Sequence, residues 1–281
     1  MERRRFGSTG KDVPIIGQGT WYIDSGRREA AIAALRAGLD HGMTHIDTAE
    51  LYGSGAAEAL VGEAMAGRRD EVFLVSKVMP NHATRNGTIK ACEQSLSHLK
   101  TDRLDCYLLH WPGQHPLQQT IEAFEQLQSQ GKILSWGVSN FDVTELEQAT
   151  HLSRNGGPVC NQVLYHLQER AIEHAVLPWC ETHGVAVVGY SPFGHDSFPS
   201  ARSTGGRVLQ QIADAHDATP RQIALSFLAR RSSLFTIPKA SSPAHATENA
   251  KAGDLALSAA ELASIDAAFP LGPRPRALPM I

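Results

Sequence analysis

Short runs of apolar and β-branched residues alternate along the chain with longer segments in which apolar residues recur at helical spacing. In the segment 29–41, for example, Ile32, Leu35 and Leu39 fall on one stripe, and segments 84–99 and 117–130 have similar patterns. The pair Thr219-Pro220 has the form of an N-cap followed by a first-turn proline, which predicts a helix over 221–230. The runs predicted to be strands are residues 15–17, 44–47, 72–78, 104–110, 133–139, 159–163, 186–190 and 234–237.

Strict alternation of strands and helices predicts parallel strands joined by crossover helices. Eight such repeats in 281 residues favour a closed (β/α)₈ barrel over an open sheet. The segment 6–13 precedes the first strand and carries turn residues at 8–10, so we expect a small N-terminal β-hairpin that closes the bottom of the barrel. No linker rich in proline or glycine divides the chain, and we therefore expect one domain over residues 1–281.

Composition narrows the classes of function. A net charge of −3 without a basic run gives no electrostatic reason to expect a nucleic-acid partner. No apolar stretch is long enough to span a membrane, and the N-terminus does not resemble a signal peptide. The four cysteines are scattered without metal-binding spacing, so we interpret them as small buried hydrophobic residues. We expect a cytoplasmic monomer without a metal, acting on a small molecule.

Four polar residues lie where the predicted strands end, which is the face of a barrel that carries its chemistry. Asp47 ends one strand, Lys77 lies inside the next apolar strand, and His110 ends the one after. A charge inside an apolar strand needs a partner, and Asp47 is the nearest candidate. Tyr52 follows Asp47 on the same loop. A phenol, with a pKa of about 10, is a poor acid until a neighbouring ammonium stabilises its phenolate. The pattern therefore indicates proton delivery at the barrel mouth.

These four residues resemble the catalytic tetrad of the aldo-keto reductases. Four further segments carry the resemblance in order: residues 137–141 (GVSNF), 161–163 (NQV), 190–192 (YSP) and 237–239 (IPK). Residues 17–21 (GQGTW), the short loops and the brief C-terminal tail are most similar to small bacterial reductases of methylglyoxal and related aldehydes. The resemblance implies NADPH-dependent reduction of small aldehydes and dicarbonyls by hydride transfer. Tyr52 would be the general acid, Lys77 would tune its pKa, Asp47 would hold the lysine, and His110 would orient the carbonyl.

The resemblance also implies which residues bind the cofactor and the substrate. The implied cofactor-binding residues are Thr20, Asp47, Ser139, Asn140, Gln162, Tyr190, Ser191, Phe193, Gly194, Lys239, Ser241, His245, Glu248 and Asn249. The implied substrate-binding residues are Trp21, Tyr52, His110 and Trp111. The sequence lacks a Rossmann fingerprint, because residues 53–58 (GSGAAE) lack the last glycine and follow no strand directly. Any dinucleotide would therefore be bound at the mouth of a barrel and not by a Rossmann fold.

The cofactor-binding segment that the resemblance implies departs from the family pattern at its adenosine end. In many relatives a lysine, a serine directly after it and an arginine a few residues on bind the 2′-phosphate. Here Lys239 is present, but Ala240 replaces the serine and His245 replaces the arginine. A histidine cannot make the bidentate hydrogen bonds of a guanidinium, and it is ordinarily only partly charged at pH 7. We therefore expect a preference for NADPH over NADH that is weaker than usual and widens toward pH 6.

Two other functions remain open at this stage. Lys77 could be the Schiff-base lysine of a barrel aldolase, although pairing with Asp47 would keep it protonated. The chain could also be a regulatory subunit that keeps the barrel and the cofactor but has little turnover. An intact tetrad argues against the second reading without excluding it.

Overall fold

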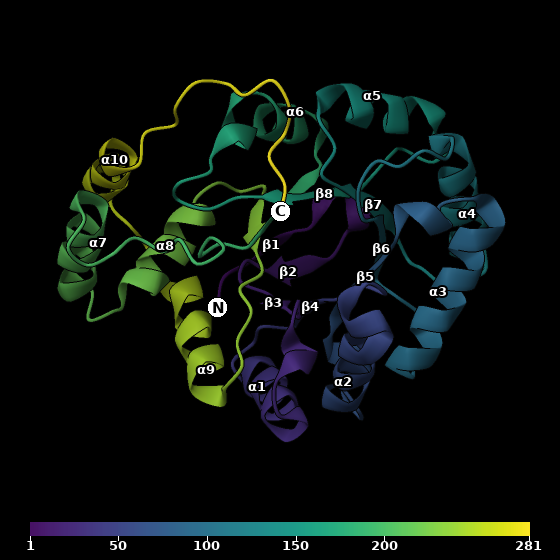
Figure 1. The fold of residues 1–281 in the computed structure, drawn as a ribbon, viewed down its shortest axis with the longest axis horizontal. Coiled ribbons are helices and arrows are strands. Elements are labelled where there is room, and N and C mark those ends of the chain that lie inside the picture. The colour runs from purple at the N-terminus through teal and green to yellow at the C-terminus, as the bar shows by residue number, and fades with distance from the viewer.

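The computed structural model describes residues 1–281, and its centre is a ring of parallel strands surrounded by helices (Figure 1). Neighbouring strands along the chain are neighbours in the sheet, as in a β/α barrel. The strands are β3 (Gln18–Gly19), β4 (His45–Asp47), β5 (Phe73–Val78), β6 (Cys106–Leu109), β7 (Trp136–Ser139), β8 (Cys160–Leu164), β9 (Ala186–Tyr190) and β10 (Leu234–Thr236). Parallel bridges from Ile16 to Thr236 and from Gly19 to Lys239 join the two edges. The predicted barrel is confirmed.

The prediction of the first strand was incomplete. Within the predicted run 15–17, Ile16 makes a bridge to Thr236 of β10, but the residues that pair with β4 are Gln18 and Gly19. Ile15 and Ile16 are apolar because they pack in a cluster with Leu225 at the side of the barrel. Gln18 is buried, and its amide donates to the carbonyl oxygens of α1 and of the turn after it. At Gly19 an added Cβ would lie 2.6 Å from the oxygen of Ile237. Neither residue type gives a strand signal in the sequence.

An antiparallel hairpin precedes the barrel, formed by β1 (Arg3–Arg5) and β2 (Asp12–Pro14) and joined through the short turn Gly7–Thr9. Between them the ring of Phe6 is fully buried and packs against the rings of His45, Phe73 and Phe235. These contacts place the hairpin at the N-terminal end of the strands, since His45 and Phe73 begin β4 and β5. The expected hairpin at the barrel bottom is present.

The helices form the outer layer, and their apolar faces pack on the strands in one large core. They are α1 (Arg28–Asp40), α2 (Ala56–Ala64), α3 (Arg85–Leu99), α4 (Leu117–Ser129), α5 (Val143–Leu152), α6 (Val176–His183), α7 (Thr204–Ala215), α8 (Pro220–Leu228), α9 (Pro243–Lys251) and α10 (Ala259–Ala268). Thr219 caps α8 and Pro220 is its first residue, as the sequence predicts. No helix is both long and apolar enough to cross a membrane.

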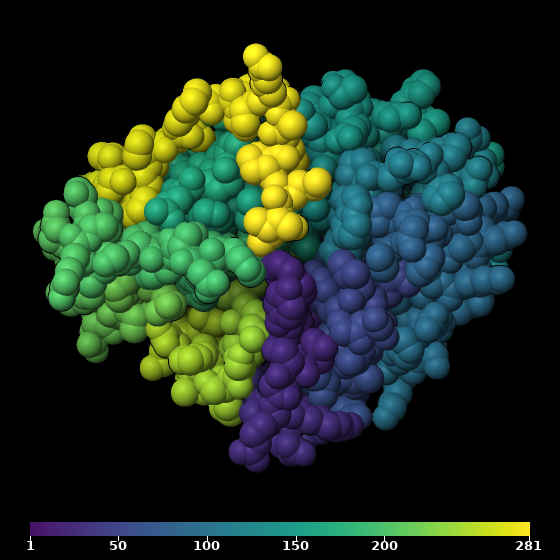
Figure 2. Space-filling view, viewed as in Figure 1, coloured from purple at the N-terminus to yellow at the C-terminus, as the bar shows by residue number.

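The chain after α10 runs back over the barrel. In the space-filling view this tail lies at the centre of the face, beside residues near the N-terminal end of the chain (Figure 2). Its last residue, Ile281, lines the pocket at the mouth of the barrel. The backbone oxygen of Phe269, where the tail begins, accepts a hydrogen bond of 2.8 Å from the guanidinium of Arg170. The tail therefore starts from a fixed point and helps to shape the site.

Candidate active site

A buried ammonium lies at the centre of the site. Lys77 projects from β5 next to β4 and is fully buried, together with Asp47. Its Nζ donates to Asp47 Oδ1 at 2.5 Å, to the backbone oxygen of Thr48 at 2.8 Å and to the phenol oxygen of Tyr52 at 3.2 Å. The three protons of the ammonium therefore have three acceptors. The ion pair between Lys77 and Asp47 that the sequence predicted is present.

Tyr52 is brought over the lysine by a tight turn, the 3₁₀ segment Tyr52–Gly55. Gly53, Ser54 and Gly55 all have positive φ there, which reverses the chain within one turn. The preceding Glu50 fastens the loop to the end of β5, since its carboxylate accepts from the N–H of Met79 at 2.6 Å. The phenol oxygen accepts from Lys77 and donates to no protein group, so its own proton is available to a molecule in the pocket.

The protonation states of Tyr52 and Lys77 follow from their burial and from their charged neighbours. Burial raises the pKa of Tyr52 above its ordinary value, and the ammonium of Lys77 opposes that rise without reversing it. The phenol is therefore protonated at neutral pH. Burial alone would lower the pKa of Lys77, but Asp47 and Tyr52 outweigh it and the net shift is upward. The lysine is therefore a permanent cation at working pH.

His110 follows β6 and faces Tyr52 across the pocket, with the two rings edge to face and their centroids 5.7 Å apart. Burial, reinforced by the charge of Lys77, lowers the pKa of His110 to about 2. Its imidazole is therefore neutral at any physiological pH. A neutral imidazole can donate one N–H to an oxygen between it and Tyr52 without competing as an acid.

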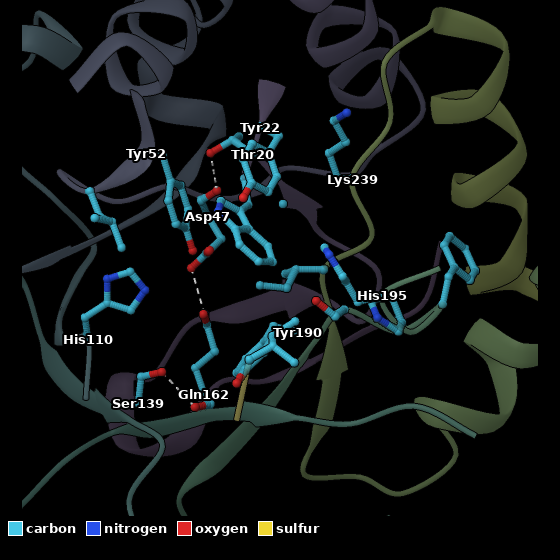
Figure 3. Close-up of a pocket in the computed structure, with 18 of the residues that line it drawn as sticks. Thr20, Tyr22, Asp47, Tyr52, His110, Ser139, Gln162, Tyr190, His195 and Lys239 are labelled. Atoms are coloured by element: carbon cyan, nitrogen blue, oxygen red, sulfur yellow. Dashed lines mark hydrogen bonds between the residues drawn. The ribbon is translucent and has the colours of Figure 1, made fainter. Parts of the chain in front are cut away.

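The opposite wall carries amides, a hydroxyl and one aromatic ring (Figure 3). Gln162 on β8 donates to Asp47 Oδ2 at 2.7 Å, which leaves its own amide oxygen free. Ser139 ends β7 and donates to the backbone of Gln162, and Asn140 follows in a left-handed conformation. The hydroxyl of Tyr190, at the end of β9, donates to Asn140 Oδ1 at 3.0 Å. On the near side, Thr20 donates to the backbone of Asp47 at 2.9 Å.

The loop after β9 makes a tight turn beside this wall. Ser191 and Gly194 both have positive φ, and the N–H of Gly194 donates to the oxygen of Ser191 at 2.8 Å. Lys239 forms the bridge to Gly19 that helps to close the barrel, and its side chain lies across the pocket from His110 (Figure 3). The side chain of Lys239 is exposed and makes no ion pair with any residue of the chain.

One pocket of about 480 Å³ joins these groups. Of the site residues named from the sequence, those that line it are Thr20, Trp21, Asp47, Tyr52, His110, Trp111, Ser139, Asn140, Gln162, Tyr190, Ser191, Phe193, Gly194 and Lys239. Lys77 lies directly beneath it, behind Asp47 and Tyr52.

Four named residues lie outside the pocket, on α9 or before it. Ser241 and His245 are exposed, and Asn249 is buried. The carboxylate of Glu248 accepts a hydrogen bond of 2.7 Å from Thr219 at the cap of α8. These four residues could contact only a ligand that extends beyond Lys239 toward α9.

Sequence reasoning missed several lining residues that belong to loops. His195 stacks on Trp21 with ring centroids 5.8 Å apart, and Leu51 and Ile281 add apolar surface. His195 directly follows the named residues Phe193 and Gly194, which was the available signal. Ile281 had none, because the path of a tail without periodicity is set by tertiary contacts.

The comparisons with known proteins agree with this geometry. The model of the aldo/keto reductase family matches residues 15–269. The methylglyoxal reductase YeaE of Escherichia coli K12 is 44% identical over 96% of this chain and 95% of its own. The glyoxal reductase of Bacillus subtilis 168 is 31% identical over 92% of this chain and 90% of its own.

Solved structures are similar along the whole chain. A crystal structure of an aldo/keto reductase from Klebsiella pneumoniae in complex with NADP and acetate has a TM-score of 0.93, with 44% identity and 99% of both chains covered. A family model that spans most of the chain, together with relatives at this identity, leaves one conclusion. The chain belongs to the aldo/keto reductase family.

Proposed function

We propose that this protein is an NADPH-dependent reductase that converts small aldehydes and dicarbonyls, such as methylglyoxal, to alcohols. The observation that carries the proposal is the phenol of Tyr52, protonated and directed at the pocket, on the ammonium of Lys77. Family membership and the methylglyoxal and glyoxal reductases among its relatives support the substrate class. Relatives crystallised with NADP and NADPH support the cofactor.

The residues present fit a nicotinamide dinucleotide. A carboxamide needs an acceptor and a donor. The amide oxygen of Gln162 is free to accept. The amide nitrogen of Asn140 can donate if it exchanges one of its two long bonds, to the backbone oxygen of His110 at 3.3 Å or to Ser139 Oγ at 3.2 Å. Tyr190, whose hydroxyl donates to Asn140, offers an aromatic face in the same part of the pocket. At the other end of the pocket, the turn through Gly194 and the unpaired cation of Lys239 suit phosphates. We therefore assign the cofactor to the wall from Ser139 to Lys239.

When bound, the cofactor supplies a hydride to the carbonyl carbon. The chain's own residues then handle the oxygen. A carbonyl oxygen placed between Tyr52 and His110 accepts a hydrogen bond from the neutral imidazole and receives the phenol's proton. The ammonium of Lys77 stabilises the phenolate that forms, and Asp47 fixes the ammonium in place. Proton transfer therefore needs no movement of the buried charges.

The dimensions of the pocket favour small substrates. Its volume of about 480 Å³ must hold part of the cofactor as well as the carbonyl compound. Trp21, Trp111 and the tail residue Ile281 also line it and narrow the space that remains for the substrate. A reactive aldehyde or dicarbonyl fits such a space, whereas a steroid would need a longer apolar wall.

The structure disfavours the aldolase alternative, because an amine must lose a proton before it can attack a carbonyl. All three protons of Lys77 are bound by acceptors, and its pKa is shifted upward. The regulatory alternative predicts cofactor binding without turnover. We further propose that residues 1–281 act as one domain and that the protein works as a cytoplasmic monomer.

The direct test is the oxidation of NADPH, followed at 340 nm, with methylglyoxal, glyoxal, a larger aromatic aldehyde and a steroid ketone as substrates. We expect kcat/KM to be highest for the two dicarbonyls. Binding of NADPH without turnover of any carbonyl would favour the regulatory alternative. A steroid reduced more efficiently than methylglyoxal would overturn the assigned substrate class.

A further inference from the structure

An arginine without an anionic partner lies on two aromatic rings beside the cofactor wall. Arg221 is the second residue of α8, and its side chain is exposed. The guanidinium carbon lies 4.8 Å from the ring centroid of Phe198 and 5.6 Å from that of Phe193. The side chain of Arg221 forms no hydrogen bond or ion pair with the chain, and Asp196, in the same loop as the two rings, lies beyond salt-bridge distance. Contacts with two rings hold a guanidinium in place without neutralising it.

The position of Arg221 connects it to the proposed cofactor site from two sides. Phe193, on which it stacks, lines the pocket next to Gly194. The residues on either side of Arg221 in the capping box reach α9, since Thr219 donates to Glu248 Oε1 and Gln222 to the backbone of Glu248. The guanidinium therefore lies between the loop after β9 and the start of α8. Hydrogen bonds join that end of α8 to α9.

We propose that Arg221 is a cofactor-binding residue whose guanidinium contacts a phosphate of NADPH. This inference rests on the proposed function, because it requires the dinucleotide to lie along the wall from Ser139 to Lys239. Lys239 is the other unpaired cation of that wall, and it lines the pocket. Arg221 supplies a guanidinium from a different element of the fold. Its forked donors match a phosphate, either the 2′-phosphate or the pyrophosphate.

The test is the dissociation constant of NADPH and of NADH, measured by titration calorimetry at fixed ionic strength for the wild type and Arg221→Ala. We expect the variant to bind NADPH about 10-fold more weakly, as for loss of one charge-assisted hydrogen bond. A loss for NADPH alone assigns the 2′-phosphate, and an equal loss for NADH assigns the pyrophosphate. Arg221→Met keeps most of the packing on the rings without the charge, so it should lose affinity to the same extent.

The matched control is Arg202→Ala, which removes an exposed arginine with no aromatic or ionic contact and changes the net charge equally. It should leave both constants unchanged. The inference fails if Arg221→Ala binds both nucleotides within twofold of the wild type, or if Arg202→Ala loses as much. It also fails if Arg221→Met keeps the wild-type affinity, because packing rather than charge would then explain the loss in Arg221→Ala. Failure of the proposed function looks different, since the wild type itself would then bind neither nucleotide, or would bind NADPH without turning over any carbonyl.

Discussion

Lys77 shows at the scale of single residues how a burial cost can support function. Its ammonium has no contact with solvent, and only the combined acceptors of Asp47, Thr48 and Tyr52 make that placement tolerable. Asp47 is itself held by Gln162 from the far side of the barrel. The same contacts that satisfy the buried charge therefore fix its distance to the phenol. Stability and catalysis are coupled through one pair.

Mutation can separate the effect of this ion pair on stability from its effect on catalysis. Asp47→Asn leaves the buried ammonium without its counter-charge, so we expect a loss of about 3–5 kcal/mol in the free energy of unfolding. The double variant Asp47→Leu with Lys77→Met removes both charges and should recover most of that loss. It should not recover kcat, because the phenolate of Tyr52 then has no cation. Urea unfolding and kcat for methylglyoxal are the two measurements. A double variant with near wild-type kcat would contradict the role of Lys77.

At the scale of elements, the turn Tyr52–Gly55 decides where the phenol lies. Gly55 has a φ of 94°, and a Cβ added there would meet the imidazole of His98. That imidazole cannot move freely, because its Nδ1 lies 3.1 Å from the buried carboxylate of Glu58. Glu58 in turn accepts from Ser76, the neighbour of Lys77 on β5. The back of the turn is thus tied to the strand that carries the lysine.

We expect Gly55→Ala to displace the turn and lower kcat at least about 10-fold, since small misplacements of a catalytic group are costly. The affinity for NADPH should change little. Gly131→Ala is the matched control: its φ is 71°, and a Cβ there would meet nothing within 4 Å. It should cost about 1–2 kcal/mol of stability from backbone strain alone and leave kcat unchanged. Equal kcat values for the two variants would show that the turn does not position Tyr52.

The strands and the four helices named from the sequence could be predicted because they have a hydrophobic period or a capping signal. The helix over 84–99 was predicted within one residue of α3, and Thr219-Pro220 gave the start of α8. The tetrad could be placed because strand ends in a barrel share one face. His195, Ile281 and the stack of Arg221 on Phe198 could not be foreseen, because they depend on the paths of loops. The first strand was predicted only in part, because Gln18 and Gly19 pair with β4 without an apolar signal.

At the scale of the whole molecule, the bottom of the barrel carries a second buried histidine. His45 begins β4 and packs edge to face against Phe6 and Phe73, and neither of its ring nitrogens has a hydrogen-bond partner. Burial, reinforced by Lys77, lowers the pKa of His45 to about 3. The unfolded chain has the ordinary value of about 6.5. Below that pH the imidazole of His45 binds a proton in the unfolded state but not in the folded state, so the free energy of unfolding falls as the solution becomes more acidic.

Each buried neutral histidine therefore lowers the free energy of unfolding by about 1.4 kcal/mol per pH unit below 6.5, or by about 2 kcal/mol at pH 5. His45→Leu removes one such group and should make the decline in unfolding free energy between pH 7 and pH 5 shallower by about that amount. The control is His41→Gln at an exposed site, which should follow the wild type. Urea unfolding at several pH values measures all three. The same decline in His45→Leu as in the wild type would show that His45 is not neutral when folded.

In the proposed reaction Tyr52 delivers the proton to the substrate, while the cofactor binds without help from the phenol. Tyr52→Phe tests it most directly, because the phenylalanine keeps the ring that packs against His110 and loses only the hydroxyl on Lys77. The measurement is kcat for methylglyoxal together with the dissociation constant of NADPH. We predict a fall in kcat of at least about 10²-fold, with the dissociation constant within twofold of the wild type. A variant that keeps most of its kcat would contradict the account.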